Sequence, residues 1–346
     1  MLFMNGGVRI KKIIDEKELL RMMTLINDKG DYLLCVRCMT YNHSEYIKDA
    51  LDGFCMQRTK FPFYTVVFDD ASTDGEQEVI KSYMERHFEF SEGSGCKQWE
   101  TEEAVFVFAR HKENENCYFL VVYLKKNLYK TPRKDELIKE WCVAKYIALC
   151  EGDDYWTDPL KLQKQVDFLE EHEDFSICFH EAKVFNQAEG RFVEDKIRMV
   201  PSETDIIELA KGNFIHTMTV MYRNNSMVGE DIKKIGQVVT GDYVSHMLYA
   251  RYGRIKKLSD RMAVYRLHEG GAWGMKNEMD RLPLWNAMLI RIMPFFDDKV
   301  QSVLHEQYMQ NCKDMFYFGE IKAKSTRAYR LGHFLLHPFK VLGLKV

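Results

Sequence analysis

Short apolar runs alternate along the chain with polar loops and with segments that have helical character. Apolar runs at 33–39, 64–68 and 146–150 predict buried strands, because each is short and ends abruptly at polar positions. Segment 45–56 carries apolar residues at helical spacing, and a capping-box pattern predicts a second helix over 74–87. Strand, polar loop and helix in repeated succession predict an α/β fold with a parallel sheet.

Further elements follow in the rest of the chain. The strands we expect there span 104–110, 118–124, 176–179, 214–222 and 262–267. The helices we expect span 134–143, begin at Asp158-Pro159, and span 241–251. The stretch 88–117 interrupts the strand–helix rhythm and predicts a hairpin-like insertion. The chain therefore divides into an N-terminal extension (1–30), an α/β domain (31–275) and a C-terminal helical region (276–346).

Length, composition and charge favour a reduced α/β protein over a nucleic-acid-binding or membrane-spanning one. The 346 residues, 46% of them hydrophobic, suffice for one large α/β domain with an appendage. A net charge of −3 gives no attraction to nucleic acid. Nine dispersed cysteines indicate reduced thiols, and Cys35 and Cys38 would point to opposite faces of their strand, so we expect core packing. Without a membrane-spanning apolar window or a signal-peptide pattern, a cytoplasmic protein is expected.

The C-terminal segment 321–346 has six Lys/Arg residues and no acid, interleaved with apolar side chains. Such a segment suits a peripheral contact with the anionic inner face of a membrane. A helix packed against the α/β domain is the alternative.

Two adjacent carboxylates, Asp153 and Asp154, end the predicted strand 146–150. Paired carboxylates at a strand end cost stability unless a cation or hydrogen-bond donors lie between them. Mg²⁺ or Mn²⁺ is commonly held by one or two carboxylates together with phosphate oxygens. One aspartate can then ligate the metal while its neighbour accepts hydrogen bonds from a ribose. A solvated turn is the alternative interpretation.

Other polar groups follow the first two strands at the edge where such sheets bind ligands. Asp69 and Asp70 end the second strand, and a carboxylate there can accept an N–H of a nucleobase; helix capping and solvation are the alternative. Thr40, Tyr41 and Asn42 end the first strand and can hold a base or a sugar, although ordinary turns use the same residues.

The last part of the α/β domain adds a candidate base and a candidate phosphate site. Asp242 opens a predicted helix, either as a plain cap or as a general base. Arg266 and His268 lie in a glycine-containing cluster that can close over a diphosphate, with His268 as a metal ligand and Arg266 as a charge partner. Dinucleotide, P-loop, nucleophile-elbow and zinc-protease motifs are absent from the sequence.

Taken in order, these motifs closely resemble bacterial family 2 glycosyltransferases, which are inverting enzymes of the GT-A fold. The segments that carry the resemblance are 40–42, 68–75, 146–156 and 158–165. The resemblance covers about 31–87 and 143–275. It implies a GT-A (nucleotide-diphospho-sugar transferase, Rossmann-like) domain with a mostly parallel central sheet flanked by helices, followed by a C-terminal helical extension. Many members build capsule, lipopolysaccharide or exopolysaccharide.

The resemblance also implies residue roles. A nucleotide-sugar donor, expected to be UDP-linked, would be bound by Thr40, Tyr41, Asn42, Glu45, Asp69, Asp70, Asp153 and Arg266. Asp69 would contact the base and Asp153 the ribose, whereas Asp154 and His268 would bind Mg²⁺ or Mn²⁺. Asp242 would remove the proton of the acceptor hydroxyl.

We therefore expect a metal-dependent inverting glycosyltransferase that transfers a sugar to a hydroxyl of a glycan or a lipid-linked oligosaccharide. The alternative is a non-catalytic nucleotide- or glycan-binding module with a degenerate site, against which both acid pairs and Asp242 argue. A nucleotidyltransferase is a weaker alternative, because it would normally carry a glycine-rich phosphate loop after the first strand.

Overall fold

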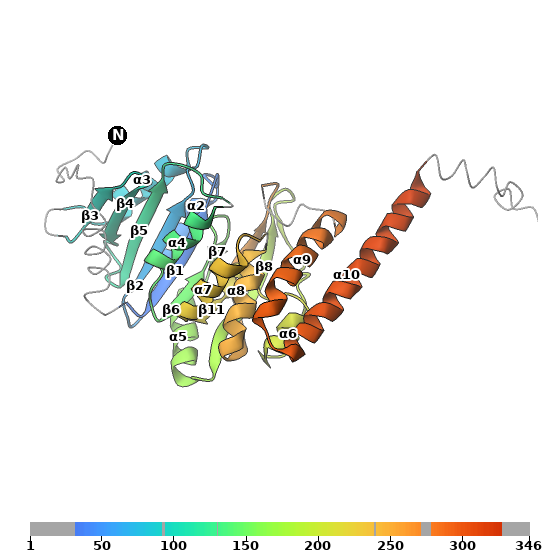
Figure 1. The fold of residues 1–346 in the computed structure, drawn as a ribbon. Coiled ribbons are helices and arrows are strands. Elements are labelled where there is room, and N and C mark those ends of the chain that lie inside the picture. Colours follow the sequence, from blue (N-terminus) through green and yellow to red (C-terminus); the bar gives the residue numbers. More distant parts are fainter. Residues whose placement is uncertain (1–31, 92–93, 130, 239, 271–277, 327–346) are drawn as a thin grey trace, which may run out of the picture. The chain divides into compact units, whose positions relative to one another are not determined.

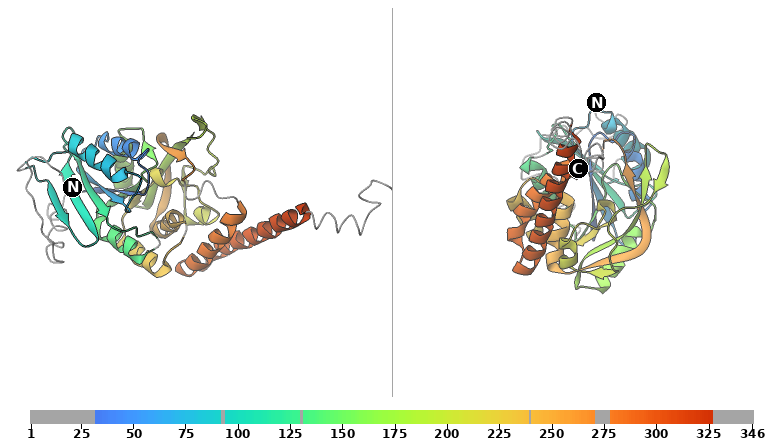
Figure 2. Two further views of the ribbon diagram at one scale, coloured as in Figure 1. Left: turned by 90° about the horizontal axis from the view of Figure 1, so that it is seen from above. Right: turned by 90° about the vertical axis from the view of Figure 1, so that its right-hand side faces the viewer.

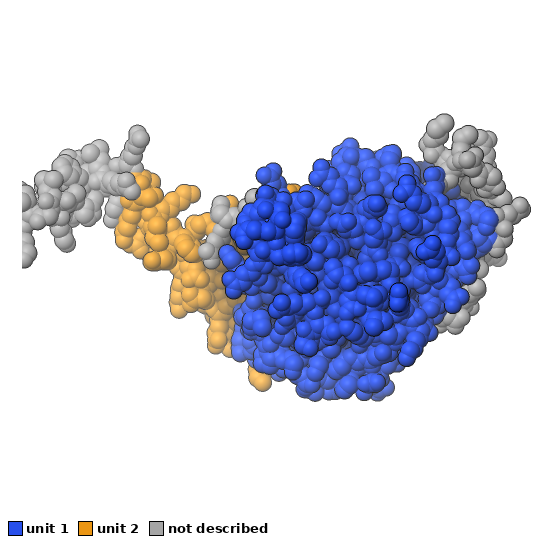
Figure 3. Space-filling model, turned by 180° about the vertical axis from the view of Figure 1, so that it is seen from behind, with its two compact units in different colours: residues 1–269 blue, residues 270–346 orange. Residues whose placement is uncertain are grey.

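The computed structural model describes residues 32–91, 94–129, 131–238, 240–270 and 278–326 (Figure 1). The expected N-terminal extension and most of the basic C-terminal segment lie outside the described residues. The chain separates into two compact units, residues 1–269 and residues 270–346 (Figure 3).

The described part of the first unit contains a twelve-stranded sheet. Its centre has the order β6-β1-β2-β5, and neighbouring strands there pair parallel. These strands are β6 (Tyr146–Leu149), β1 (Leu34–Thr40), β2 (Phe63–Asp69) and β5 (Cys117–Leu124). Every residue of β2 and β6 is buried, as short uninterrupted apolar runs predict. The carboxyl ends of β1, β2 and β6 therefore meet at one edge of the sheet.

Strands on both flanks make the sheet mixed, so the expected mostly parallel arrangement is confirmed only for the centre. The flanking strands are β3 (Lys97–Glu100), β4 (Ala104–Arg110), β7 (Tyr155–Trp156), β8 (Phe175–Asn186), β9 (Arg191–Val193), β10 (Glu203–Thr204), β11 (Met221–Arg223) and β12 (Arg254–Leu267). Except for the parallel pair β8–β12, these strands pair antiparallel with their neighbours. The links 101–103 and 111–116 are too short for a parallel crossover, which explains the antiparallel β3–β4–β5 order.

Helices cover the sheet on both faces. They are α2 (Ile47–Cys55), α3 (Glu76–His87), α4 (Pro132–Trp141), α5 (Lys161–Glu171), α6 (Ile206–Ala210), α7 (Ser226–Ile235) and α8 (Gly241–Tyr249), with the 3-10 turns η1 (Thr217–Thr219) and η2 (Ala250–Tyr252). Helices α2 and α3 lie side by side (Figure 2). Helix α5 begins at Lys161, two residues after the expected start at Pro159.

The start of α3 differs from the expected capping box. Gly75 is the N-cap in a left-handed conformation with φ of 92°, and Asp74 accepts the Glu76 N–H at 3.1 Å. Gln77, the expected reciprocal partner, instead donates its side-chain N–H to Asp69. The result is that the first turn of α3 is tied to the end of β2.

Trp156 anchors the loop that follows β6 in the hydrophobic core. Its indole N–H donates to the carbonyl oxygen of Met218 at 2.8 Å, and its ring lies 4.9 Å from that of Phe54. Gly53 allows this approach, because a Cβ there would lie 2.9 Å from the Trp156 nitrogen. The two aspartates that precede this tryptophan therefore start from a fixed backbone.

The described residues 278–326 of the second unit are mainly helical. They contain α9 (Glu278–Ile292), η3 (Met293–Phe295) and α10 (Asp298–Ser325). The long helices contact each other, with Trp285 Nε1 donating to Gln307 Oε1 at 2.9 Å. Among the described residues, no helix combines the length and apolar character needed to cross a bilayer.

Candidate functional site

Two histidines and one aspartate meet at the edge of the sheet where β1 and β6 end. His43 follows β1, Asp153 follows β6, and His268 follows β12. Asp153 Oδ2 lies 3.0 Å from His268 Nε2 and 3.7 Å from His43 Nε2. One ligand atom from each side chain lies within 4.8 Å of the others. We call these residues the His–Asp–His cluster; their donor atoms fit a divalent metal ion.

Electrostatics keep the aspartate of this cluster ionised. Burial alone would raise the pKa of Asp153, but the hydrogen bond from His268 and the charge of His43 bring it below the ordinary value. An ionised carboxylate at neutral pH is the form that binds a cation.

Arg266 on β12 fastens the loop that carries Asp153. Its Nε donates to the Asp153 carbonyl oxygen at 2.9 Å, and its Nη2 donates to Asp49 Oδ2 at 2.6 Å. Its guanidinium lies 4.8 and 5.1 Å from the ring centroids of Tyr46 and Tyr155. We expected this cation to face a diphosphate. Arg266 is 8% exposed, and its guanidinium donates hydrogen bonds to Asp153 and Asp49 within the protein. It therefore holds the backbone of the loop that carries Asp153.

Asp154, the expected metal ligand, is not part of the His–Asp–His cluster. It is 4% exposed, and its Oδ1 accepts the backbone N–H of Arg266 at 2.8 Å. Burial raises its pKa well above the ordinary value, and the neighbouring charge of Asp153 adds to the effect. The structure thus brings Asp153, which we had expected at the ribose, to the candidate metal position.

The loop after β1 contains further expected nucleotide contacts. Tyr41 and Glu45 are exposed and open to a ligand. Asn42 has a φ of 56°, and its side-chain oxygen accepts the Thr73 N–H at 2.8 Å, while its own N–H donates to Ser72 Oγ at 3.0 Å. Asn42 therefore joins the loops after β1 and β2.

Thr40, an expected nucleotide contact, forms its hydrogen bond within the protein interior. It is 3% exposed, and its hydroxyl donates to the carboxylate of Glu76, the first residue of α3. The loop after β6 lies directly on it, because Gly152 N–H donates to the Met39 carbonyl oxygen at 3.0 Å.

The adjacent acids Asp69 and Asp70, at the end of β2, make different contacts. Asp69 is fully buried; its Oδ1 accepts from Ser72 N and from Gln77, whereas its Oδ2 has no hydrogen-bond partner in the described part of the chain. Burial raises the pKa of Asp69. The Asp70 carboxylate accepts the Leu128 N–H and so holds the loop after β5. Asp69 thus has one buried oxygen that no described residue satisfies.

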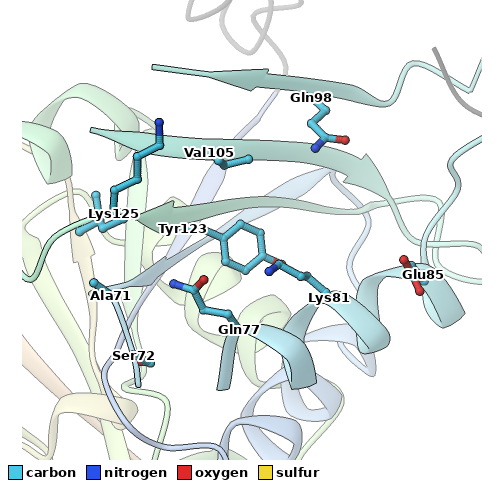
Figure 4. A pocket seen from close by; sticks show the side chains of 10 residues that line it. Ala71, Ser72, Gln77, Lys81, Glu85, Gln98, Val105, Tyr123 and Lys125 are labelled. Atoms are coloured by element: carbon cyan, nitrogen blue, oxygen red, sulfur yellow. The ribbon is translucent and has the colours of Figure 1, made fainter. Parts of the chain in front are cut away.

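A pocket of about 450 Å³ opens beside α3 and the strands β3, β4 and β5 (Figure 4). Its lining residues are Ala71, Ser72, Gln77, Lys81, Glu85, Gln98, Val105, Tyr123, Leu124 and Lys125. The Tyr123 hydroxyl and the Gln98 amide nitrogen are buried there without a hydrogen-bond partner among the described residues. The residues of the His–Asp–His cluster do not line this pocket, so it is separate from the candidate metal position.

Asp242 lies in the first turn of α8 and acts electrostatically on the acidic loop. Burial raises the pKa of Glu151 to about 7; Arg37 opposes this shift, and the charges of Asp153 and Asp242 add to it. The candidate base, Glu151 and the cluster aspartate therefore share one electrostatic environment.

Our sequence reasoning missed His43, Glu76 and Glu151. His43 and Glu151 had a positional signal, because they lie within three residues of the ends of strands β1 and β6, at the same sheet edge as the residues we selected. Glu76 opens α3, where a carboxylate is ordinarily read as a helix-dipole partner.

Comparison with known proteins gives relatives of limited coverage. A scan against models of known families found no match. Uncharacterized proteins of Mycobacterium tuberculosis and Mycobacterium bovis are 33% identical over 249 residues, which is 72% of this chain and 62% of theirs. The matched part thus spans less than two thirds of these relatives. An uncharacterized glycosyltransferase of Mycoplasma genitalium is 27% identical over 126 residues, 36% of this chain and 33% of that protein.

The similarity to solved structures covers more of this chain than the sequence relatives do. The 1–349 fragment of S. aureus TarS in complex with UDP-GlcNAc has a TM-score of 0.54 and 18% identity, covering 79% of this chain and 71% of that chain. The mannosyltransferase PcManGT of Pyrobaculum calidifontis, in complex with GDP-Man and Mn²⁺, has a TM-score of 0.52 and 13% identity, covering 95% and 90%. This chain therefore has the fold of glycosyltransferase structures.

Proposed function

We propose that this protein is a metal-dependent inverting glycosyltransferase of family 2 with a GT-A catalytic domain. It would transfer a sugar from a nucleotide-diphosphate donor, expected to be UDP-linked, to a hydroxyl of a glycan or a lipid-linked oligosaccharide. The observation that carries the proposal is the His–Asp–His cluster at the carboxyl edge of the parallel strands, where α/β sheets bind ligands. The expected role in capsule, lipopolysaccharide or exopolysaccharide synthesis rests on the family resemblance.

Asp153, His43 and His268 are the residues we assign to the metal, in place of the expected Asp154. When bound there, a divalent cation would offset the negative charge that develops on the leaving diphosphate. Arg266 contributes by fixing the Asp153 backbone, which keeps the carboxylate aimed at both imidazoles.

Asp69 is the residue we assign to the nucleobase. Its buried Oδ2 offers an unpaired acceptor, while Ser72 and Gln77 hold Oδ1. A base that presents an N–H to this oxygen would satisfy it, and a base without that donor would leave it unpaired, at a cost of about 1–3 kcal/mol.

Asp242 is the residue we assign to proton removal. A carbohydrate hydroxyl is a poor nucleophile at neutral pH, so a carboxylate that takes its proton as the new bond forms lowers the barrier. A single displacement with this base inverts the anomeric centre, and the proton ends on Asp242.

The test is Asp242→Asn, measured with a panel of nucleotide sugars and glycan acceptors. We expect transfer to fall by about 10²–10⁴-fold, whereas donor binding in a thermal-shift assay stays at the parental level. Glu173→Gln, on the exposed turn between α5 and β8, is the matched control and should keep full activity. Transfer by Asp242→Asn at the parental rate would contradict the assignment, and wild-type donor binding without turnover would favour a binding module.

We further propose that the segment 321–346 brings the enzyme to the inner face of the cell membrane, where a lipid-linked acceptor would lie. Deletion of these residues should abolish flotation with anionic liposomes while donor binding is retained. Equal flotation of both proteins would contradict a role of this segment in membrane contact.

A further inference from the structure

The pocket of about 450 Å³ beside α3 follows from the way in which β3 and β4 join the sheet. The links 101–103 and 111–116 contain no helix, so these two strands extend the sheet beyond β5 without bringing a helix to cover them. Figure 4 shows α3 on one side of the pocket and β3, β4 and β5 on the other. The sheet thus continues past its covering helix and leaves a hollow there.

The floor of this pocket is one face of the sheet. Val105 of β4 and Tyr123 of β5 are direct cross-strand partners, and Gln98 of β3 lies on the same face. Trp99 and Phe106 alternate with these residues and lie on the opposite face, where their rings stack with centroids 4.9 Å apart. Aromatic packing therefore closes one face of the hairpin, whereas the other face lines the pocket.

Two polar groups on this floor have no hydrogen-bond partner among the described residues. They are the hydroxyl of Tyr123, a residue only 4% exposed, and the Gln98 amide nitrogen. Burial raises the pKa of Tyr123 well above its ordinary value, and the charge of Asp69 adds to the effect, so the hydroxyl keeps its proton. Lys81 Nζ lies 5.4 Å from the Tyr123 ring centroid, and so long a side chain can turn aside without backbone movement. A ligand with oxygen acceptors would pair both groups.

The charged side chains around the pocket already have partners of opposite sign. Lys125 Nζ lies 2.7 Å from Glu100 Oε1, and Lys81 Nζ lies 3.8 Å from Glu78 Oε1. Glu85, the third charged residue of the lining, is exposed to solvent. Neither lysine therefore presents an uncompensated charge to an anionic ligand. The groups that lack partners are a neutral hydroxyl and a neutral amide, which favours an uncharged ligand.

We propose that this pocket is an accessory binding site for a neutral sugar residue. The hydroxyl oxygens of a sugar can accept hydrogen bonds from Tyr123 and Gln98, and its C–H groups can pack against Val105 and Leu124. The volume falls within the range of about 300–1,000 Å³ that is usual for small-molecule sites. Asp69, the residue we assign to the nucleobase, does not belong to the lining, and neither does the His–Asp–His cluster.

The use of this sugar rests on the proposed function, whereas sugar binding itself does not. If the chain transfers a sugar to a glycan, another residue of the same glycan can occupy the pocket. Holding the acceptor at a second point would raise its effective concentration where transfer takes place. We therefore expect the pocket to affect the KM for the glycan and not the chemical step.

The test is saturation-transfer-difference NMR on the full chain with glucose, galactose, mannose and N-acetylglucosamine, and with uridine for comparison. We expect at least one of these neutral sugars to bind. Tyr123→Phe removes the hydroxyl and Gln98→Met removes the amide, and each change should weaken binding of that sugar by about 3–10-fold. Tyr118→Phe, on the same strand but outside the lining, is the matched control and should bind the sugar as the wild type does.

Urea unfolding separates this role from a structural one. Because the Tyr123 hydroxyl has no described partner, Tyr123→Phe should unfold at the wild-type urea concentration or above it. A lower midpoint would contradict the unpaired hydroxyl. Binding of none of the four sugars, or wild-type binding by both Tyr123→Phe and Gln98→Met, would overturn the proposal. Uridine binding that Tyr123→Phe weakens would assign the pocket to a nucleobase and overturn it as well.

Transfer kinetics test the use of the pocket by the glycan. Tyr123→Phe should raise the KM for the glycan by about 3–10-fold while kcat stays unchanged. An unchanged KM would overturn the glycan's use of this pocket. Sugar binding as described, without sugar transfer by the wild type, would count against the proposed function alone.

Discussion

Gly152 is a position where one added methyl group should disrupt both packing and metal binding. A Cβ at Gly152 would lie 2.1 Å from the Thr40 hydroxyl oxygen, 2.7 Å from Thr40 Cβ and 3.0 Å from Ile47 Cδ1. The Gly152 N–H is held by the Met39 carbonyl oxygen at 3.0 Å, so the loop cannot withdraw without losing a backbone hydrogen bond. Thr40 must therefore move away from Glu76.

The size of the effect follows from two contributions. Overpacking a close-packed site costs about 1–3 kcal/mol. Displacing the Thr40 hydroxyl leaves an acceptor of the buried Glu76 unpaired, which costs about 1–3 kcal/mol more. Gly152→Ala should thus lower the free energy of unfolding by about 2–6 kcal/mol, a large share of the 5–15 kcal/mol of a typical domain. Because the Thr40 hydroxyl oxygen also lies 3.3 Å from His43 Nδ1, Co²⁺ binding at the proposed metal position should weaken as well.

Urea unfolding followed by circular dichroism, together with Co²⁺ titration, measures both effects. Gly229→Ala is the matched control, because the same methyl group in α7 meets its nearest atom, Lys139 Cδ, at an ordinary 3.7 Å. Relief of glycine's entropic cost in a helix should stabilise that variant by about 0.5–1 kcal/mol. If Gly152→Ala is as stable as the wild type and binds Co²⁺ equally well, the account of Thr40 as a fixed element of the site is refuted.

Two further predictions concern residues that support the site. Burial lowers the pKa of Lys161 from 10.5 to about 7. The unfolded chain binds more protons between these values, so Lys161 should contribute a rise in stability of up to about 1.4 kcal/mol per pH unit over that range. Lys161→Met should flatten this dependence in urea unfolding at pH 7.5 and 8.5, and an unchanged slope would contradict the lowered pKa of Lys161. Arg266→Met removes the donors to Asp153 and Asp49 and should weaken Co²⁺ binding, measured by calorimetry, without rescue by Arg266→Lys; rescue by lysine would show that charge alone suffices.

The central strands could be predicted because burial on both faces leaves an unbroken apolar run. The runs 33–39, 64–68 and 146–150 became β1, β2 and β6 with ends shifted by one residue at most. Parallel pairing then puts their carboxyl ends at one edge, which brings Asp153 near the loop after β1. The antiparallel flanks also had a signal, because the links 101–103 and 111–116 leave no room for crossover helices.

The different contacts of Asp153 and Asp154 could not be predicted from the sequence. Both are carboxylates in the same turn after β6, and no periodicity of a strand or helix fixes their directions there. What distinguishes them is the Arg266 backbone N–H, 112 positions later, which holds Asp154 at 2.8 Å and leaves Asp153 to the histidines. A pairing at that distance along the chain depends on β12 reaching β7, which no local pattern encodes.

The contacts of Thr40, a residue that supports the proposed metal ligands, could not be predicted from the sequence either. A threonine at a strand end is equally suited to a ribose, a base or a buried acceptor, and we had expected a nucleotide contact. Its actual partner, Glu76, lies 36 positions away and was itself expected only as part of a helix start. Ligand residues and the residues that orient them belong to the same polar types, so only their contacts separate them. Thr40→Val, which removes the hydroxyl, and Thr40→Ser, which keeps it, test that separation directly. An orienting hydroxyl should change metal affinity at the proposed site without contacting the metal.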